Sequence, residues 1–202
     1  GANAESEAGY ARSKARGEAA VLETLPDAVI VRPSIVFGPE DQFFNRFANM
    51  ARFSPFLPLI GGGQTKFQPV YVGDVAEALA LTVDGKAAGG TIYELGGPEV
   101  LTFRECMEHM LKVIDRKRAF VPVPWPIAAL QGAILGMLPN PLLTSDQVTL
   151  LKTDNVVSDQ AISQGRTLAA LGITPQSLDA ILPSYLWRYR IAGQYTKDNP
   201  AL

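Results

Sequence analysis

Cysteine and histidine are almost absent from this sequence of 202 residues, which contains one of each, Cys106 and His109. A single cysteine cannot form an internal disulfide, so nothing points to a secreted, disulfide-stapled fold, and we expect a reducing compartment such as the cytoplasm. A single histidine excludes a histidine-rich metal site. We interpret both residues as structural parts of one helix.

An excess of positive charge is also missing. The chain has 18 lysines and arginines against 20 aspartates and glutamates, which gives a net charge of −2. Proteins that hold nucleic acid by neutralising its phosphates carry a basic excess. We therefore expect no nucleic-acid partner.

Long hydrophobic runs are lacking as well. Residues 1–20 contain no apolar segment of the kind that signal peptides have. The longest uncharged run, residues 119–145, is interrupted by five prolines, and its one helix-compatible piece, 127–138, has 12 residues. A membrane span needs about 20 apolar residues. Because the chain starts without methionine and enters a helix almost at once, we expect it to begin within a domain.

Apolar residues make up 47% of the chain, enough for a substantial core. Helical and strand patterns alternate along it, which predicts an α/β fold. Two capping boxes are expected, Asp74 with Glu77 and Thr102 with Glu105, and a cap is expected at Thr174 before a proline. The expected helices cover residues 10–25, 41–53, 75–83, 102–114 and a last stretch ending near 191; the expected strands cover 28–31, 66–72, 91–95 and 120–123.

The stretch YARSK places Tyr10 and Lys14 four residues apart on the first helix, so both side chains share one face. An ammonium group beside a phenol favours the phenolate, and such a tyrosine can exchange a proton with a substrate during hydride transfer. A lysine so placed can also bind a ribose hydroxyl. The alternative is an ordinary exposed helix face.

Further motifs give this pair a context. YARSKARGEAA, VIVRPSIVFGPED, FQPVYVGDVAEAL, YELGGPEVLTFRE and LGITPQSLDAIL follow one another along the chain. In this order they resemble the extended short-chain dehydrogenase/reductases, the NAD-dependent epimerase/dehydratase family. RPSIVFGPEDQFFNRFANMARF, KFQPVYVGDV and LTSDQVTLLKTDNVV are similar to one branch of it, the NAD(P)H-binding accessory subunits of respiratory complex I and their bacterial relatives.

The resemblance implies the C-terminal portion of a Rossmann-type fold. Residues 1–37 and 67–98 would belong to the nucleotide domain, and residues 38–66 and 99–202 mostly to a small substrate domain. Tyr10 would be the proton donor and acceptor, and Lys14 would bind the nicotinamide ribose. Arg32 would serve cofactor, substrate or a structural carboxylate. The remaining cofactor-binding residues implied lie along the nicotinamide: Pro33, Ser34, Ile35 and Val36.

The Gly-rich half of a dinucleotide site is missing from the sequence. No G-x-G-x-x-G is present, and the triplet at Gly61 leads into a strand, whereas a pyrophosphate site opens a helix. The catalytic serine of the family would precede Gly1. A charge-assisted hydrogen bond contributes ~1.5–3 kcal/mol, and micromolar binding needs ~8 kcal/mol. We expect the intact protein to bind NAD(P)(H), and this chain alone to bind little or none.

Three functions stay open. The complex I branch implies an accessory subunit with little turnover. The wider family implies a working NAD(P)-dependent reductase, epimerase or dehydratase that uses Tyr10 and Lys14. Relatives linked to ubiquinone synthesis imply a scaffold for quinone-synthesis proteins. Either partner, complex I or those proteins, would place the chain peripherally on the inner face of the inner membrane, the matrix side in a mitochondrion.

The uncharged segment from Val121 to Leu143 allows two interpretations. Its large apolar residues can pack the core of the small domain. They can also touch a partner or a membrane surface, because basic residues come just before them. The residues concerned are Trp125, Ile127, Leu130, Ile134, Leu135, Met137 and Leu138, preceded by Lys112, Arg116, Lys117 and Arg118.

Overall fold

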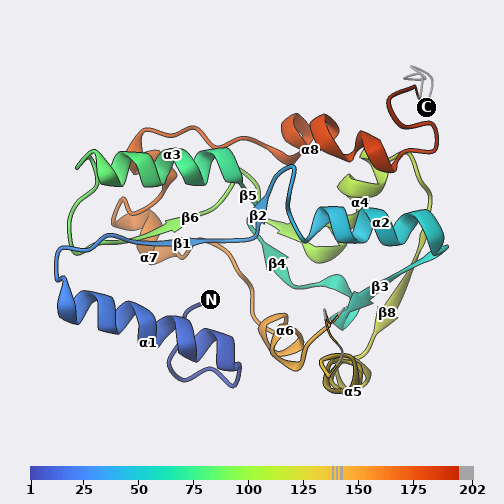
Figure 1. Cartoon of the computed structure of the whole chain (residues 1–202), viewed down its shortest axis with the longest axis horizontal. Coiled ribbons are helices and arrows are strands. Elements are labelled where there is room, and N and C mark those ends of the chain that lie inside the picture. The colour runs from blue at the N-terminus through green and yellow to red at the C-terminus, as the bar shows by residue number, and fades with distance from the viewer. Residues whose placement is uncertain (138, 140, 142, 196–202) are drawn as a thin grey trace.

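Two parallel strands, β1 (Ile30–Pro33) and β6 (Ile92–Leu95), pair from Ile30 opposite Ile92 to Pro33 opposite Leu95. The structure is a computed structural model, which describes residues 1–137, 139, 141 and 143–195. Helix α3 (Val72–Val83) covers one side of the pair and α1 (Gly9–Thr24) lies on the other (Figure 1). The predicted α/β fold is confirmed.

The other described strands also occur in pairs. Two of these pairs are parallel and one is antiparallel. They are β2 (Val36–Phe37) with β5 (Val70–Tyr71), β3 (Phe56–Ile60) with β8 (Ala119–Val123), and β4 (Lys66–Phe67) with β7 (Leu101–Thr102).

The largest core lies between three helices, α2 (Phe44–Phe53), α4 (Phe103–Val113) and α8 (Leu178–Leu186). The apolar stripe predicted for 41–53 faces it, and a phenylalanine cluster forms there with ring centroids 5.0–6.4 Å apart. Its members are Phe43, Phe44, Phe47, Phe67 and Phe103. Cys106 is fully buried here, and burial raises the pKa of its thiol to about 12.

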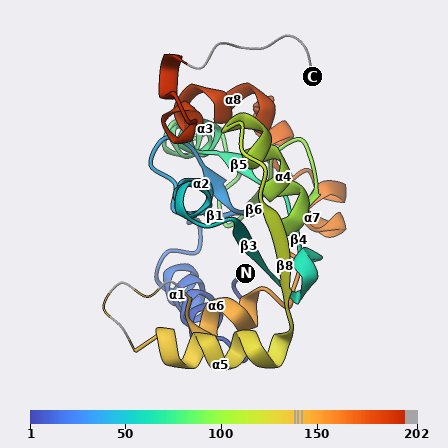
Figure 2. The same ribbon diagram turned by 90° about the vertical axis from the view of Figure 1, so that its right-hand side faces the viewer.

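Two smaller cores complete the packing. One joins α3 to β6 and the 3₁₀ turn Leu168–Leu171. The other joins the ends of β3 and β8 to α5 (Trp125–Leu135) and α6 (Ser145–Leu150), which lie at one end of the molecule (Figure 2). The remaining short elements are α7 (Asp159–Ser163) and 3₁₀ turns at Gly61–Gly63, Trp187–Tyr189 and Gly193–Tyr195.

Some expected helix starts are wrong. The Thr102–Glu105 capping box is present at α4. Asp74 does not cap α3, because that helix already begins at Val72, and the Asp74 carboxylate is instead buried and accepts a hydrogen bond from the Gln176 backbone N–H at 2.8 Å. Asp74 therefore has a structural role, as expected, but it connects two distant segments of the chain and does not cap a helix.

The last helix and one strand also differ from expectation. Ser177, not Thr174, caps α8 by accepting from the Ala180 N–H, and the α-helix ends at Leu186 before a 3₁₀ turn. The single strand expected over 66–72 splits into β4 and β5, which pair with different partners on either side of Pro69. Proline has no N–H to continue a ladder.

Gly97, two residues after β6, lies close to the backbone just before β5. A Cβ at this position would overlap the carbonyl oxygen of Pro69. We expect Gly97→Ala to lower the free energy of unfolding by about 2–3 kcal/mol in urea titrations, because the backbone at Pro69 must shift to make room for the new Cβ. The control is Gly17→Ala, where nothing lies within 4 Å of the new Cβ and the helix should gain up to about 1 kcal/mol. Equal effects of the two changes would contradict this account.

Candidate functional site

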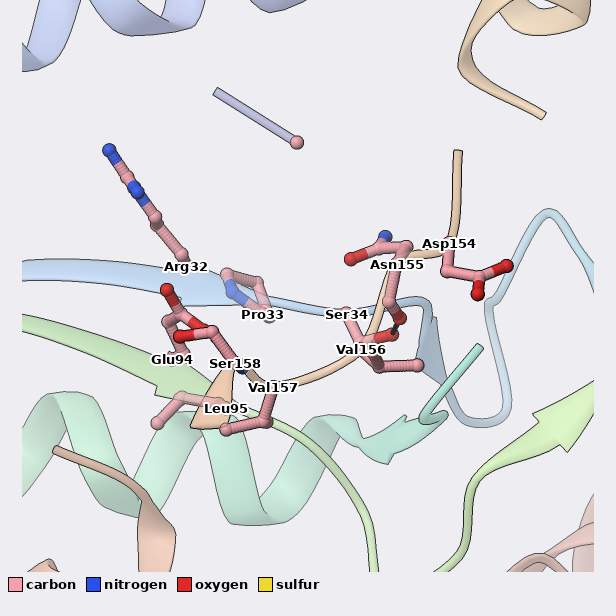
Figure 3. Close-up of a pocket in the computed structure, with 11 residues that line it drawn as sticks. Arg32, Pro33, Ser34, Glu94, Leu95, Asp154, Asn155, Val156, Val157 and Ser158 are labelled. Carbon is pink, nitrogen blue, oxygen red and sulfur yellow. Dashed lines mark hydrogen bonds between the residues drawn. The ribbon is translucent and has the colours of Figure 1, made fainter. Parts of the chain in front are cut away.

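A cavity of about 140 Å³ lies at the carboxyl ends of β1 and β6. Arg32, Pro33 and Ser34 line it from β1 and the residues that follow, Glu94 and Leu95 line it from β6, and segment 154–158 closes it (Figure 3). In α/β sheets, ligands bind outside the carboxyl ends of the parallel strands. This is therefore the candidate site, and three of the predicted site residues lie in it.

Ser34 connects segments of the chain that meet at the cavity. Its side chain is buried, its hydroxyl donates to the Asn155 carbonyl at 2.6 Å, and the same oxygen accepts from the Gln68 N–H at 3.1 Å. The hydroxyl thus connects the residue after β1 to two other segments.

Arg32 is engaged with a carboxylate of α1. Its guanidinium forms a paired interaction with Glu18, with Nε 2.9 Å from Oε1 and Nη2 against Oε2. The hydrogen bond to Glu18 raises the pKa of Arg32 above its ordinary value. Of the three roles expected for Arg32, the structure displays the one with a structural carboxylate, and this ion pair fastens α1 to β1.

Tyr10 and Lys14 lie together on α1. The Lys14 Nζ is 5.4 Å from the centroid of the Tyr10 ring, and 54% of the Tyr10 surface is exposed. Neither residue lines the cavity. Two groups of predicted site residues are therefore formed, one on α1 and one at the end of β1, and the ion pair between Arg32 and Glu18 connects them.

Ile35 and Val36 lie outside the cavity lining. Ile35 packs against the core between α2, α4 and α8, while Val36 pairs with Val70 in β2 and packs against the α3 core. Both side chains help to fix the segment that follows β1.

Asp146 is a functional candidate that sequence reasoning missed. The residue before α1 is Ala8, which has no side-chain acceptor for the first helical N–H groups. The carboxylate of Asp146, from α6, replaces it by accepting from the Gly9 N–H at 3.2 Å and from the Tyr10 N–H at 2.9 Å. A negative charge at a helix N-terminus is stabilising. The separation of 136 residues hides this contact from any local pattern.

Gln68 is a second residue that the sequence did not single out. Its side-chain amide donates to the Gly97 carbonyl at 2.8 Å and its Oε1 accepts from the Val157 N–H at 3.0 Å. Glu94 accepts from the Ser158 N–H at 2.8 Å. These bonds hold segment 154–158 against the residues just before β5 and against the end of β6.

The described residues offer only parts of a nicotinamide dinucleotide site, and these parts lie in two separate groups. Tyr10 and Lys14 present a hydroxyl and an ammonium group on α1, and Pro33 presents an apolar ring to the cavity. The cavity is smaller than the roughly 300–1,000 Å³ of ordinary ligand pockets, and the chain has no Gly-rich turn for a pyrophosphate. Within the described residues there is no cluster of three metal-ligating side chains.

Residues 3–130 match the RmlD substrate binding domain family. The chain belongs to this family. Like other members of the RmlD substrate binding domain family, it therefore has a fold related to short-chain dehydrogenases and epimerases, as the sequence motifs indicated.

Curated relatives align with nearly the whole chain. NADH dehydrogenase (ubiquinone) 1 alpha subcomplex subunit 9 of Arabidopsis thaliana is 41% identical over 96% of this chain and 50% of its own length. The protein of the same name from Rattus norvegicus is 35% identical over 99% of this chain and 53% of its own length. Both are mitochondrial proteins by name. The chain spans about half the length of these relatives.

Solved structures agree on the fold. A dTDP-glucose 4,6-dehydratase from Bacillus anthracis, in complex with NAD, superposes with a TM-score of 0.63 over 91% of this chain and 52% of that protein. Sequence identity is 16%, so the similarity supports the fold alone. The comparison confirms the predicted Rossmann-type architecture.

Asp146 should control the order of the first turn of α1. We expect Asp146→Ala to raise the hydrogen exchange rate of the Gly9 and Tyr10 amides about 3- to 30-fold, because loss of a cap costs about 0.5–2 kcal/mol. Asp146→Asn keeps one acceptor oxygen and should give a smaller increase. Asp84→Ala, which removes an exposed carboxylate at the end of α3, is the control. Unchanged exchange at Gly9 and Tyr10 would show that Asp146 does not hold the helix.

Proposed function

We propose that this chain forms the C-terminal part of an NAD(P)(H)-binding accessory subunit of NADH:ubiquinone oxidoreductase, in which binding and assembly dominate over turnover. The observation that carries the proposal is the 41% identity to a complex I subunit over 96% of the chain. The similarity extends across the cores and the cavity segments and is not confined to one motif. A partner among quinone-synthesis proteins is the alternative assignment for the same chain.

The cofactor in this proposal is held by the intact protein. Tyr10 and Lys14 face the nicotinamide ribose, and Pro33 contributes to the nicotinamide wall. Two exposed apolar residues, Val21 on α1 and Leu25 directly after it, support a covering partner for this helix, because burial of such side chains is favourable. When bound, NAD(P)(H) would supply a hydride donor or acceptor, and the residues of this chain would orient it.

The proposal divides the chain between two domains. Residues 1–37 and 67–98 carry the β1, β6, α1 and α3 layer and belong to the nucleotide domain. Residues 38–66 and 99–202 belong mostly to the small substrate domain. Segment 154–158 supports this division, because it crosses back to close the cavity at the strand ends.

A catalytic role is the second candidate, and the Tyr10–Lys14 pair favours it. The ammonium group lies over the phenol ring of a side chain that remains accessible. In this version Tyr10 exchanges a proton with a substrate oxygen, and Lys14 stabilises the phenolate that is left behind. The reaction class would be NAD(P)-dependent reduction, epimerisation or dehydration.

Segment 121–143 is proposed to make a peripheral membrane contact. No helix among the described residues has the length and apolar character needed to cross a bilayer. Four exposed apolar side chains nevertheless follow one another at helical spacing on α5 and the two residues after it. Their exposed fractions are 50–86%. We call them the apolar row: Ile127, Leu130, Ile134 and Met137. Leu138 lies outside the described residues. This contact would place the protein on the inner face of the inner membrane, the matrix side in a mitochondrion.

The isolated 202-residue chain should bind NADH and NADPH more weakly than micromolar. Lys14 and an apolar wall contribute only a few kcal/mol of the ~8 kcal/mol that micromolar binding needs. Isothermal titration should therefore show no saturation at low micromolar ligand, whereas the full-length protein should bind. A low-micromolar dissociation constant for the isolated chain would contradict the proposed division of the site.

Removal of the Tyr10 hydroxyl separates the two candidate functions. In an accessory subunit, Tyr10→Phe should leave assembly with the respiratory complex unchanged, because Tyr10 anchors α1 through its backbone N–H. In an enzyme, the same change should abolish turnover followed at the reduced-nicotinamide absorbance band. Tyr195→Phe, an exposed tyrosine in the last 3₁₀ turn, is the control. Turnover that survives Tyr10→Phe would remove Tyr10 from the reaction.

A further inference from the structure

Four basic residues gather where α2 ends and β8 begins. Arg52 lies in the last turn of α2, and Arg116, Lys117 and Arg118 lead into β8. We call these four residues the basic patch. Arg118 joins the two elements, because its Nε donates to the carbonyl of Ala51 at 2.7 Å.

The basic patch is not neutralised by its surroundings. Within the described part of the chain, no carboxylate lies within 4.0 Å of any of the four cations. Asp115 is the one acidic residue in the stretch from Lys112 to Arg118. Burial and the positive charges of Arg118 and Arg52 lower the pKa of Arg116. Positive charge is thus concentrated here in a chain whose net charge is −2.

Backbone carbonyls hold two of the arginines in place. Arg116 donates from Nε to the Tyr189 carbonyl at 2.9 Å, while Arg118 donates from Nε to Ala51 and from Nη1 to the Lys117 carbonyl at 2.8 Å. These bonds orient the guanidinium groups without cancelling their charge. A fixed guanidinium with remaining N–H donors matches the oxygens of a phosphate group.

Two exposed phenylalanines border the basic patch. Phe53 is 78% exposed and lies under the Arg52 guanidinium, with Cζ 5.1 Å from the ring centroid. Phe56 is 54% exposed, and its backbone is opposite Ala119, the residue after Arg118. Apolar rings beside phosphate-binding groups suit a lipid surface better than a free ion, because the rings can enter the boundary between headgroups and acyl chains.

The basic patch and the apolar row of α5 lie at the two ends of β8. This strand runs from Ala119 to Val123, about 17 Å for five residues, and leads directly into α5 (Figure 2). Residues 119–137 carry no charged side chain, and Val121 in the middle of the strand is exposed. A basic surface and an uncharged surface are therefore connected by one exposed strand.

From this placement we propose that Arg52, Arg116, Lys117 and Arg118 form a binding site for the phosphate headgroups of anionic lipids, with Phe53 and Phe56 at the lipid boundary. The site rests on the proposed membrane contact of segment 121–143, and it adds lipid selectivity to it. The apolar row provides contact that does not depend on lipid charge. The basic patch provides the preference for anionic lipid.

The test is flotation of the full-length protein with vesicles of phosphatidylcholine alone and with 30% phosphatidylglycerol. The variant is Arg52→Gln with Lys117→Gln, because neither side chain forms a hydrogen bond to the backbone in the described structure. Each basic residue at an anionic surface contributes about fivefold in affinity, so the double variant should bind anionic vesicles about thirtyfold more weakly. Phe53→Ser should lose about tenfold.

The control is Arg16→Gln with Lys86→Gln, which removes the same charge from exposed positions on α1 and after α3. This control should change binding less than twofold. An equal loss in both double variants would mean that net charge alone acts, and would overturn the site. Binding to anionic vesicles that is unchanged by Arg52→Gln with Lys117→Gln would also overturn it.

Two further arms identify the ligand and separate this inference from the proposed function. Saturable binding of inorganic phosphate that needs Arg52 and Lys117, without vesicle binding, would assign the patch to a free anion; patch-dependent association with a protein complex, without vesicle binding, would assign it to an acidic protein. Both outcomes overturn the lipid site.

Ile127→Ser with Leu130→Ser tests the apolar row. If this variant loses vesicle binding while Arg52→Gln with Lys117→Gln binds vesicles as the unchanged protein does, the membrane contact is retained and the headgroup site is rejected.

Discussion

Two carboxylates decide where the helix with Tyr10 and Lys14 lies. Asp146 accepts hydrogen bonds from the first turn of α1, and Glu18 in the same helix binds Arg32 at the end of β1. One anchor comes from the C-terminal part of the chain and the other from the sheet. The position of Tyr10 relative to the cavity therefore depends on α6 as well as on the end of β1.

The anchor at Asp146 is itself rigidly supported. Helix α6 begins with a capping box between Thr144 and Gln147, and Gly132 of α5 approaches the backbone of Thr144 so closely that a Cβ there would lie 3.0 Å from it. Val148 is buried in the core at the end of β8. The α5 surface, the cap on α1 and the Tyr10–Lys14 pair are thus connected through tightly packed backbone.

Local patterns predicted the parts of the site that local geometry determines. The spacing of Tyr10 and Lys14 places them on one helical face whatever surrounds them, and the Thr102–Glu105 capping box needs only three residues of separation. Asp74 was misassigned because its partner, Gln176, is 102 residues away and no local signal marks it. The hydrogen bonds of Ser34 and Asp146 were missed for the same reason. The family motifs predicted the fold, whereas the hydrogen-bond partners of these side chains became visible only in the tertiary structure.

The buried thiol in the helical core has a practical consequence for labelling. Thiolates, not thiols, react with maleimides, and the raised pKa of Cys106 together with its complete burial keeps it unreactive in the folded state. Cysteines introduced on the surface would then be the only attachment points for fluorophores or spin labels in this chain. One such cysteine on α1 and a second on α5 would make the distance between the two helices measurable by resonance methods without first removing a native sulfur.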